Sequence, residues 1–139
     1  MQVLFKIFPA MVLPALVYAA VALIGGAQSV SVWSGEVFAI PMASGQVWHV
    51  TAGALFLTGA LACFFVEMLR TASPSRFAIG TNLILACAFV PCVALFILVP
   101  GFATNEFFLV CVMMLLDFLL DSAVLVFTSR RTMEISGSQ

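Results

Sequence analysis

The sequence predicts an all-α membrane protein, a bundle of four transmembrane helices with a short β-hairpin between the first two helices. Composition is the first observation: 64% of the 139 residues are hydrophobic, 8% are charged, and the mean hydropathy is +1.24. About a quarter of the residues in a soluble domain are charged, so this chain is far more apolar. The second observation is that the apolar residues gather in runs. Because one span takes roughly 20 residues, four spans with short connections use most of the chain.

The apolar runs cover residues 8–27, 47–69, 77–99 and 107–127. A helix rises about 1.5 Å per residue, so each run is long enough to cross a hydrocarbon core of about 30 Å. With their connections the runs make a single domain over residues 1–131, and we expect no separate soluble domain. A cleaved signal peptide is the alternative for the first run, since Lys6 precedes it. The run is long, however, and follows only one basic residue.

Residues 28–46, between the first two runs, are predicted to form a β-hairpin. β-Favouring residues alternate there between two Ser-Gly pairs, which is typical of a hairpin. An irregular loop is the alternative. Trp33 and Trp48 have the amphipathic rings that anchor at a membrane interface, and His49 is expected to make a hydrogen bond at the same interface.

The basic residues predict the orientation of the helices. They lie before the first span, between the second and third spans, and after the fourth. These residues are Lys6, Arg70, Arg76, Arg130 and Arg131. Short loops that carry Lys and Arg stay in the cytoplasm, so both termini are expected there and the hairpin on the opposite side of the membrane. The short polar tail, residues 132–139, is expected to be disordered.

We expect no catalytic site, no metal and no cofactor. The four cysteines fall inside apolar runs without Cys-x-x-Cys spacing, which is typical of small packing residues and not of a disulfide framework or a zinc site. His49 is the only histidine, and a haem usually has two axial ligands. The net charge of -1 is small and scattered, which disfavours binding to nucleic acid. The sequence has no glycine-rich phosphate loop and no catalytic combination of Ser, His, Cys and Asp.

Three acids lie inside the predicted spans, where ionisable groups are costly and usually face the bundle interior, water or a partner. They are Glu67, Asp117 and Asp121. Asp117 and Asp121 are four residues apart, so they share one face of the fourth span, and we expect that face to pack inward. Arg70 is one turn from Glu67, and Asn82 lies at about the depth of Asp121. We therefore predict an intramembrane polar cluster of all five residues.

Small residues on the second span predict which face of that helix meets a neighbour. Ala52, Gly59, Cys63 and Glu67 follow one helical stripe. Small residues permit close approach between membrane helices, so we expect this stripe to face another helix of the bundle.

Three roles are open for the aspartates. Two like charges one turn apart in a low dielectric cannot both be ionised cheaply. The first role is interhelical fastening, with the acids protonated or paired with Asn82 and Arg70. The second is to carry protons or to bind a cation during transport. The third is a contact with a charged residue of a partner subunit.

Several short stretches resemble a group of small four-helix inner-membrane proteins of Gram-negative bacteria that have no assigned activity. These stretches are Ile-Pro-Met-Ala-Ser-Gly-Gln-Val-Trp, Phe-Phe-Val-Glu-Met-Leu-Arg, Leu-Val-Pro-Gly, Leu-Leu-Asp and the closing Arg-Arg. The resemblance covers most of the chain after the first span and implies an inner-membrane location. An acid corresponding to Asp117 is usual in that pattern, whereas one at Asp121 is not. Small multidrug transporters are similar in length, but they have an acid in the first span, which is absent here.

The function expected from these features is that of a small non-enzymatic accessory or assembly subunit of an inner-membrane complex. The expected partners are the lipid bilayer and a protein, either a second copy or a different subunit within the membrane. The alternative is a small dimeric transporter, coupled to protons or cations, that uses Asp117 and Asp121.

Overall fold

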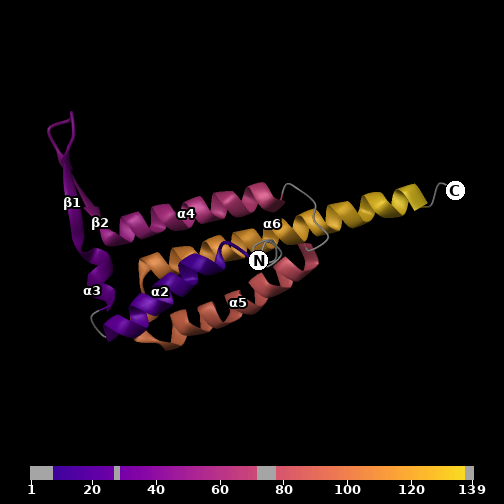
Figure 1. Cartoon of the computed structure of the whole chain (residues 1–139), viewed down its shortest axis with the longest axis horizontal. Helices are drawn as coiled ribbons and strands as arrows, with labels where there is room; N and C mark the ends of the chain where they lie inside the picture. The colour runs from indigo at the N-terminus through magenta and orange to yellow at the C-terminus, as the bar shows by residue number, and fades with distance from the viewer. Residues whose placement is uncertain (1–7, 27–28, 72–77, 137–139) are drawn as a thin grey trace.

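The computed structural model describes residues 8–26, 29–71 and 78–136 of the chain. This part is mostly helical, with one antiparallel hairpin (Figure 1). Its elements in order are α2 (Val12–Gly25), α3 (Ser29–Ser34), β1 (Glu36–Pro41), β2 (Val47–Thr51), α4 (Ala52–Thr71), α5 (Ala78–Leu98), η2 (Pro100–Phe102) and α6 (Asn105–Ser136). Lys6 and Arg76, on which the predicted orientation partly depends, lie outside the described residues.

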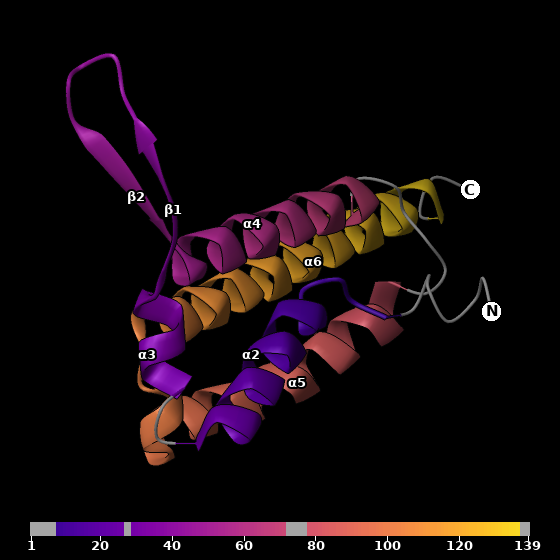
Figure 2. The ribbon, with the colours of Figure 1, turned by 60° about the vertical axis from the view of Figure 1, so that its left-hand side comes forward.

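Helix α6 is the centre of the arrangement. It packs along α4 on one side and α5 on the other, and it also contacts α2. Figures 1 and 2 show that α4 and α6 run in the same direction, opposite to α2 and α5. Helix α3, the hairpin and η2 lie at one end, which we call the hairpin end. The other end, where α4 stops at Thr71, we call the Thr71 end.

Three helices are long and apolar enough to cross a membrane, namely α4, α5 and the Asn105–Phe127 part of α6. Large apolar side chains cover their outward faces, as expected where lipid replaces water as the solvent. Exposed examples are Leu61, Phe65, Leu69, Leu83, Val90, Ile97, Leu116 and Phe127. By length and composition, the chain is therefore suited to a membrane.

Helix α2 is shorter than the predicted first span, residues 8–27. It has 14 residues, which at about 1.5 Å per residue is roughly 21 Å. The residues before Val12 form turns around the buried Pro9, whose ring removes a backbone donor. Gly26, at φ +54°, ends the helix in a conformation that favours glycine.

The hairpin lies later in the sequence than predicted. Residues 29–34, placed in the hairpin by the sequence, form α3, and residues 47–51, placed at the start of the second span, form β2. The segment Val-Trp-His-Val-Thr is rich in β-branched and aromatic residues and pairs with β1, which outweighs its apolar character as the start of a helix. Gly45, at φ +81°, supplies the turn.

The C-terminal helix is longer than predicted. The part of α6 that could cross a membrane ends at Phe127, where the fourth span was expected to end. The tail from Thr132 was expected to be disordered, but α6 continues to Ser136. No glycine or proline interrupts the sequence from Asn105 to Ser136, so nothing in it breaks the series of helical hydrogen bonds. Figure 1 shows α6 extending past the end of α4.

The core has two parts. In the middle of the bundle, α2, α4, α5 and α6 bury apolar side chains against one another. These residues are Met11, Val12, Ala15, Ala60, Leu85, Val110 and Met114. At the hairpin end, an aromatic cluster surrounds Tyr18. Its members are Tyr18, Trp33, Phe56, Phe102 and Phe107.

Trp33, which the sequence predicts at the membrane interface, belongs to this aromatic cluster. Its side chain is 6% exposed, and its ring stacks on that of Tyr18 with centroids 5.0 Å apart. The short helix α3 turns the chain back across the hairpin end, so the indole covers the core. The Tyr18 hydroxyl lies 2.6 Å from Thr104 Oγ1 and donates to the carbonyl oxygen of Gly101 at 3.2 Å.

The buried stripe of α4 is displaced by about one residue from the predicted one. Gly53, Ala60 and Glu67 are the buried positions, spaced by seven residues or about two turns. Gly59 was expected in the stripe, but it is exposed and a Cβ there would meet no atom within 4 Å. The predicted stripe combined residues from two neighbouring faces of α4. Small residues occur on both faces, so their positions did not show which face is buried.

Gly53 is the position where α3, α4 and α6 approach most closely. A Cβ at Gly53 would lie 2.7 Å from Glu106 Oε1 and 2.9 Å from the carbonyl oxygen of Trp33. We expect Gly53→Val to lower the free energy of unfolding by about 1–3 kcal/mol, because the backbone of α3 must move. Gly59→Ala is the matched control and should be neutral or stabilising by up to about 1 kcal/mol. Thermal unfolding followed by circular dichroism in detergent measures both, and equal effects would contradict the prediction.

Candidate functional site

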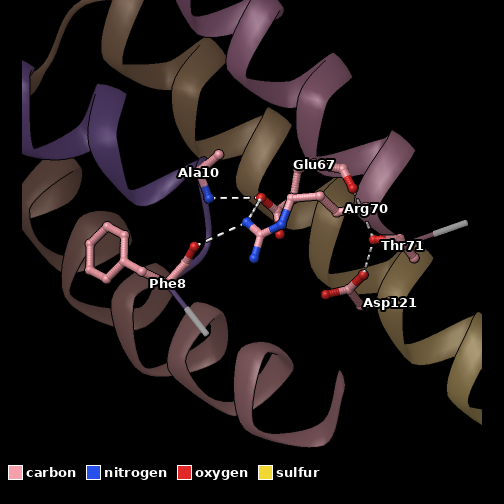
Figure 3. Close-up of polar contacts among 6 residues, drawn as sticks. All are labelled: Phe8, Ala10, Glu67, Arg70, Thr71 and Asp121. Carbon is pink, nitrogen blue, oxygen red and sulfur yellow. Dashed lines mark hydrogen bonds and ion pairs between the residues drawn. The ribbon is translucent and has the colours of Figure 1, made fainter. Parts of the chain in front are cut away.

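The polar contacts of the bundle centre on Glu67, a buried residue near the end of α4. Its Oε2 atom accepts hydrogen bonds from the backbone N–H of Ala10 and from Arg70 Nη1, both at 2.8 Å (Figure 3). The same Arg70 nitrogen donates to the carbonyl oxygen of Phe8 at 3.1 Å. Glu67 and Arg70 therefore tie the turn before α2 to α4. A carboxylate beside the start of a helix is also favoured by the helix dipole.

Thr71 links α4 to Asp121 of α6. Its hydroxyl oxygen lies 2.6 Å from Asp121 Oδ1 and 3.2 Å from the carbonyl oxygen of Glu67. A hydroxyl has one proton to donate. Thr71 therefore donates to only one of the two oxygens at a time.

Asp117 is the most deeply buried acid. Its side chain is 0% exposed, and neither of its carboxyl oxygens has a hydrogen-bond partner in the described part of the chain. It lies within electrostatic range of Glu67, Asp121 and Arg70. Three acids and one basic side chain therefore interact in this region. Glu67 and Asp121 accept hydrogen bonds, whereas Asp117 has none among the described residues.

Asn82, the fifth residue of the predicted cluster, lies apart from the acids. Its Nδ2 atom donates to Ser122 Oγ at 3.1 Å, while its Oδ1 atom is buried without a partner among the described residues. Ser122 follows Asp121 in α6 and therefore lies on a different side of that helix. The hydrogen bond between Asn82 and Ser122 joins α5 to α6, and the one between Thr71 and Asp121 joins α4 to α6.

The sequence prediction missed the groups that connect the acids. Thr71 and Ser122 are hydroxyl residues that composition does not distinguish from ordinary helix residues, although Thr71 is four residues from Glu67 and so shares its face. The backbone groups of Phe8 and Ala10 have no signature in the sequence at all.

The remaining predicted residues lie on the hairpin, far from the acids. Trp48 and His49 are both exposed on β2. His49 Nδ1 lies 2.9 Å from Glu36 Oε2, across the strand pair. In the described ranges, no three His, Cys, Asp or Glu side chains lie close enough to hold a metal ion.

No family model, no curated protein and no solved structure matches this chain. The assignment of a function therefore depends on the geometry of the acids and of the hairpin.

Proposed function

We propose that the protein is a small non-enzymatic subunit of an inner-membrane complex, and that it contacts a larger protein partner through its hairpin. One observation carries the proposal: the hairpin projects from the bundle (Figure 2), and apolar side chains on it are exposed. A two-stranded hairpin is marginally stable by itself in water, so an apolar face on one implies contact with something else.

The register of the strands defines this apolar face. Phe38 pairs with Val50 and Ile40 with Trp48, and paired residues lie on the same side of a sheet. Phe38, Ile40 and Trp48 are exposed, while Val50 is buried at the base. The opposite face carries Ala39, Pro41, Val47 and His49, so it lacks aromatic side chains but also exposes the apolar Val47.

The proposal includes four spans, with α2 as the shortest, and both termini in the cytoplasm. The distribution of Lys and Arg supports this orientation through the positive-inside rule. Four spans, an even number, would keep the two ends of the chain on one side. The resemblance to small inner-membrane proteins supports the location.

Proton- or cation-coupled transport by Asp117 and Asp121 is the alternative. Transport requires access to the acids from both sides of the membrane. On the hairpin side of Asp117, α6 presents Met114 and Val110, both fully buried in the core. This packing favours the subunit role.

Photo-crosslinking in native membranes tests the subunit role. A photoreactive residue at Ile40 is expected to give a protein adduct of one defined mass, whereas the same residue at Ala39, on the opposite face, should give little. Trp48→Ala should remove the partner from the complex purified in mild detergent, and His49→Ala, the matched control, should retain it. Adducts with lipid alone would contradict the proposal. So would proton-coupled uptake by a lone dimer in liposomes that Asp117→Asn abolishes.

A further inference from the structure

We propose that Asp117 is a proton-binding site inside the bundle, and that protons reach it from the Thr71 end only, through Thr71 and Asp121. Two independent observations support this inference. The first is the burial of a carboxyl group without a hydrogen-bond partner among the described residues. The second is a hydrogen-bonded pair, Thr71 and Asp121, that lies one turn along the same face of α6, on the Thr71 side of this acid.

The ligand is a proton because of what surrounds Asp117. An isolated carboxylate in an apolar interior costs far more than a neutral carboxylic acid, so such a group binds a proton unless a cation pairs with it. Arg70, the basic side chain that interacts with Asp117 in the described part of the chain, already donates to Glu67 and to the carbonyl oxygen of Phe8. In the described part of the chain, no group of three acidic, His or Cys side chains could hold a metal ion at this position.

The charged groups around Asp117 come from α4 and α6. Glu67 and Arg70 of α4 and Asp121 of α6 interact electrostatically with Asp117. Helices α2 and α5 have no charged side chain between Val12 and Gly25 or between Ala78 and Leu98. The net charge near Asp117 with all acids ionised would be negative, which favours uptake of a proton.

The exposure of the polar groups increases in one direction only. Asp117 is 0% exposed, Asp121, one turn further along α6, is 8% exposed, and the Arg70 side chain beside Thr71 is 30% exposed. The Thr71 hydroxyl touches Asp121 and can pass a proton to it while accepting one itself (Figure 3).

The other direction is closed by apolar packing. On the same face of α6 the next residues toward the hairpin end are Met114 and Val110, and Met11 of α2 and Ala60 of α4 pack in the same cluster. None of these four side chains has an exchangeable proton, and the thiols of Cys63 and Cys92, which pack against the same cluster, form no hydrogen-bonded chain to Asp117 among the described residues. The site therefore binds a proton from one side without conducting it across the bundle, so Asp117 responds to the pH at the Thr71 end.

Infrared spectroscopy of the full chain in lipid nanodiscs tests the site. The wild type should show the carbonyl band of a protonated carboxylic acid at the high-frequency end of its range, because the group has no hydrogen-bond partner. Asp117→Asn should remove this band while helicity and thermal unfolding stay unchanged. A wild type without the band, or a band that persists in Asp117→Asn, would overturn the proposal.

Exchange into D2O tests the route. Thr71→Val should slow the deuteration shift of the Asp117 band several-fold, and Asp121→Asn should do the same if Thr71→Val fails to fold. Thr58→Val is the matched control, because the Thr58 hydroxyl on α4 bonds only within its own helix, to the carbonyl oxygen of Ala54. Equal exchange rates in the wild type, Thr71→Val and Asp121→Asn would overturn the route through Thr71.

Discussion

Replacing Tyr18 with alanine is expected to lower the free energy of unfolding by about 3–5 kcal/mol. Tyr18 is fully buried, and its ring contacts those of Trp33, Phe56, Phe102 and Phe107. Removing the ring leaves a cavity at the point where α2, α3, α4 and α6 meet. In a membrane protein the loss comes mainly from packing, since lipid is as apolar as the core.

Reversible unfolding of the reconstituted chain by a denaturing detergent measures this effect. Tyr18→Phe keeps the ring and removes only the hydroxyl contacts with Thr104 and Gly101, so it should cost about 1 kcal/mol. Leu23→Ala is the control on the same helix, because Leu23 is 78% exposed and should affect stability little. If Tyr18→Ala were no more destabilising than Leu23→Ala, the aromatic cluster would not hold the hairpin end together.

Arg70→Met is expected to lower the free energy of unfolding by about 3 kcal/mol. This is the lower limit for breaking a buried ion pair, because Arg70 is partly exposed. The substitution leaves the buried Glu67 carboxylate with the Ala10 N–H as its remaining hydrogen-bond donor. It also removes the contact between Arg70 and the carbonyl oxygen of Phe8, which holds the start of α2. Loosening of α2 should accompany the loss of stability.

A double-mutant cycle separates the ion pair from general packing. The double variant Glu67→Gln/Arg70→Met should recover part of the stability, because an uncharged amide tolerates burial better than a carboxylate. Glu36→Gln is the matched control, since Glu36 pairs with His49 on the exposed hairpin, and such pairs contribute at most about 1 kcal/mol. Additive single effects in the cycle would show that Glu67 and Arg70 do not act as a pair.

The features predicted best from the sequence are those set by neighbouring residues. Apolar runs of sufficient length predicted the three long helices. In apolar surroundings a helix is favoured because its backbone N–H and C=O groups form hydrogen bonds within the helix. Alternating β-favouring residues around a glycine turn predicted a hairpin in the correct connection. The spacing of Asp117 and Asp121 placed both on one face of α6, because helical periodicity is local.

Only the tertiary structure decided which groups meet. Trp33 and Trp48 look alike in the sequence, yet α3 carries the first into the core while the hairpin leaves the second exposed. Residues 47–51 are as apolar as the start of a span and become a strand because β1 pairs with them. Asp121 finds Thr71 of α4, and Asn82 finds Ser122, through contacts between residues 50 and 40 positions apart. Composition and periodicity describe one element at a time, whereas partners across such separations are selected by how the helices pack. The sequence alone therefore determined the long apolar helices and the shared face of the two aspartates, while the packing determined the bounds of the hairpin and the contacts of the site.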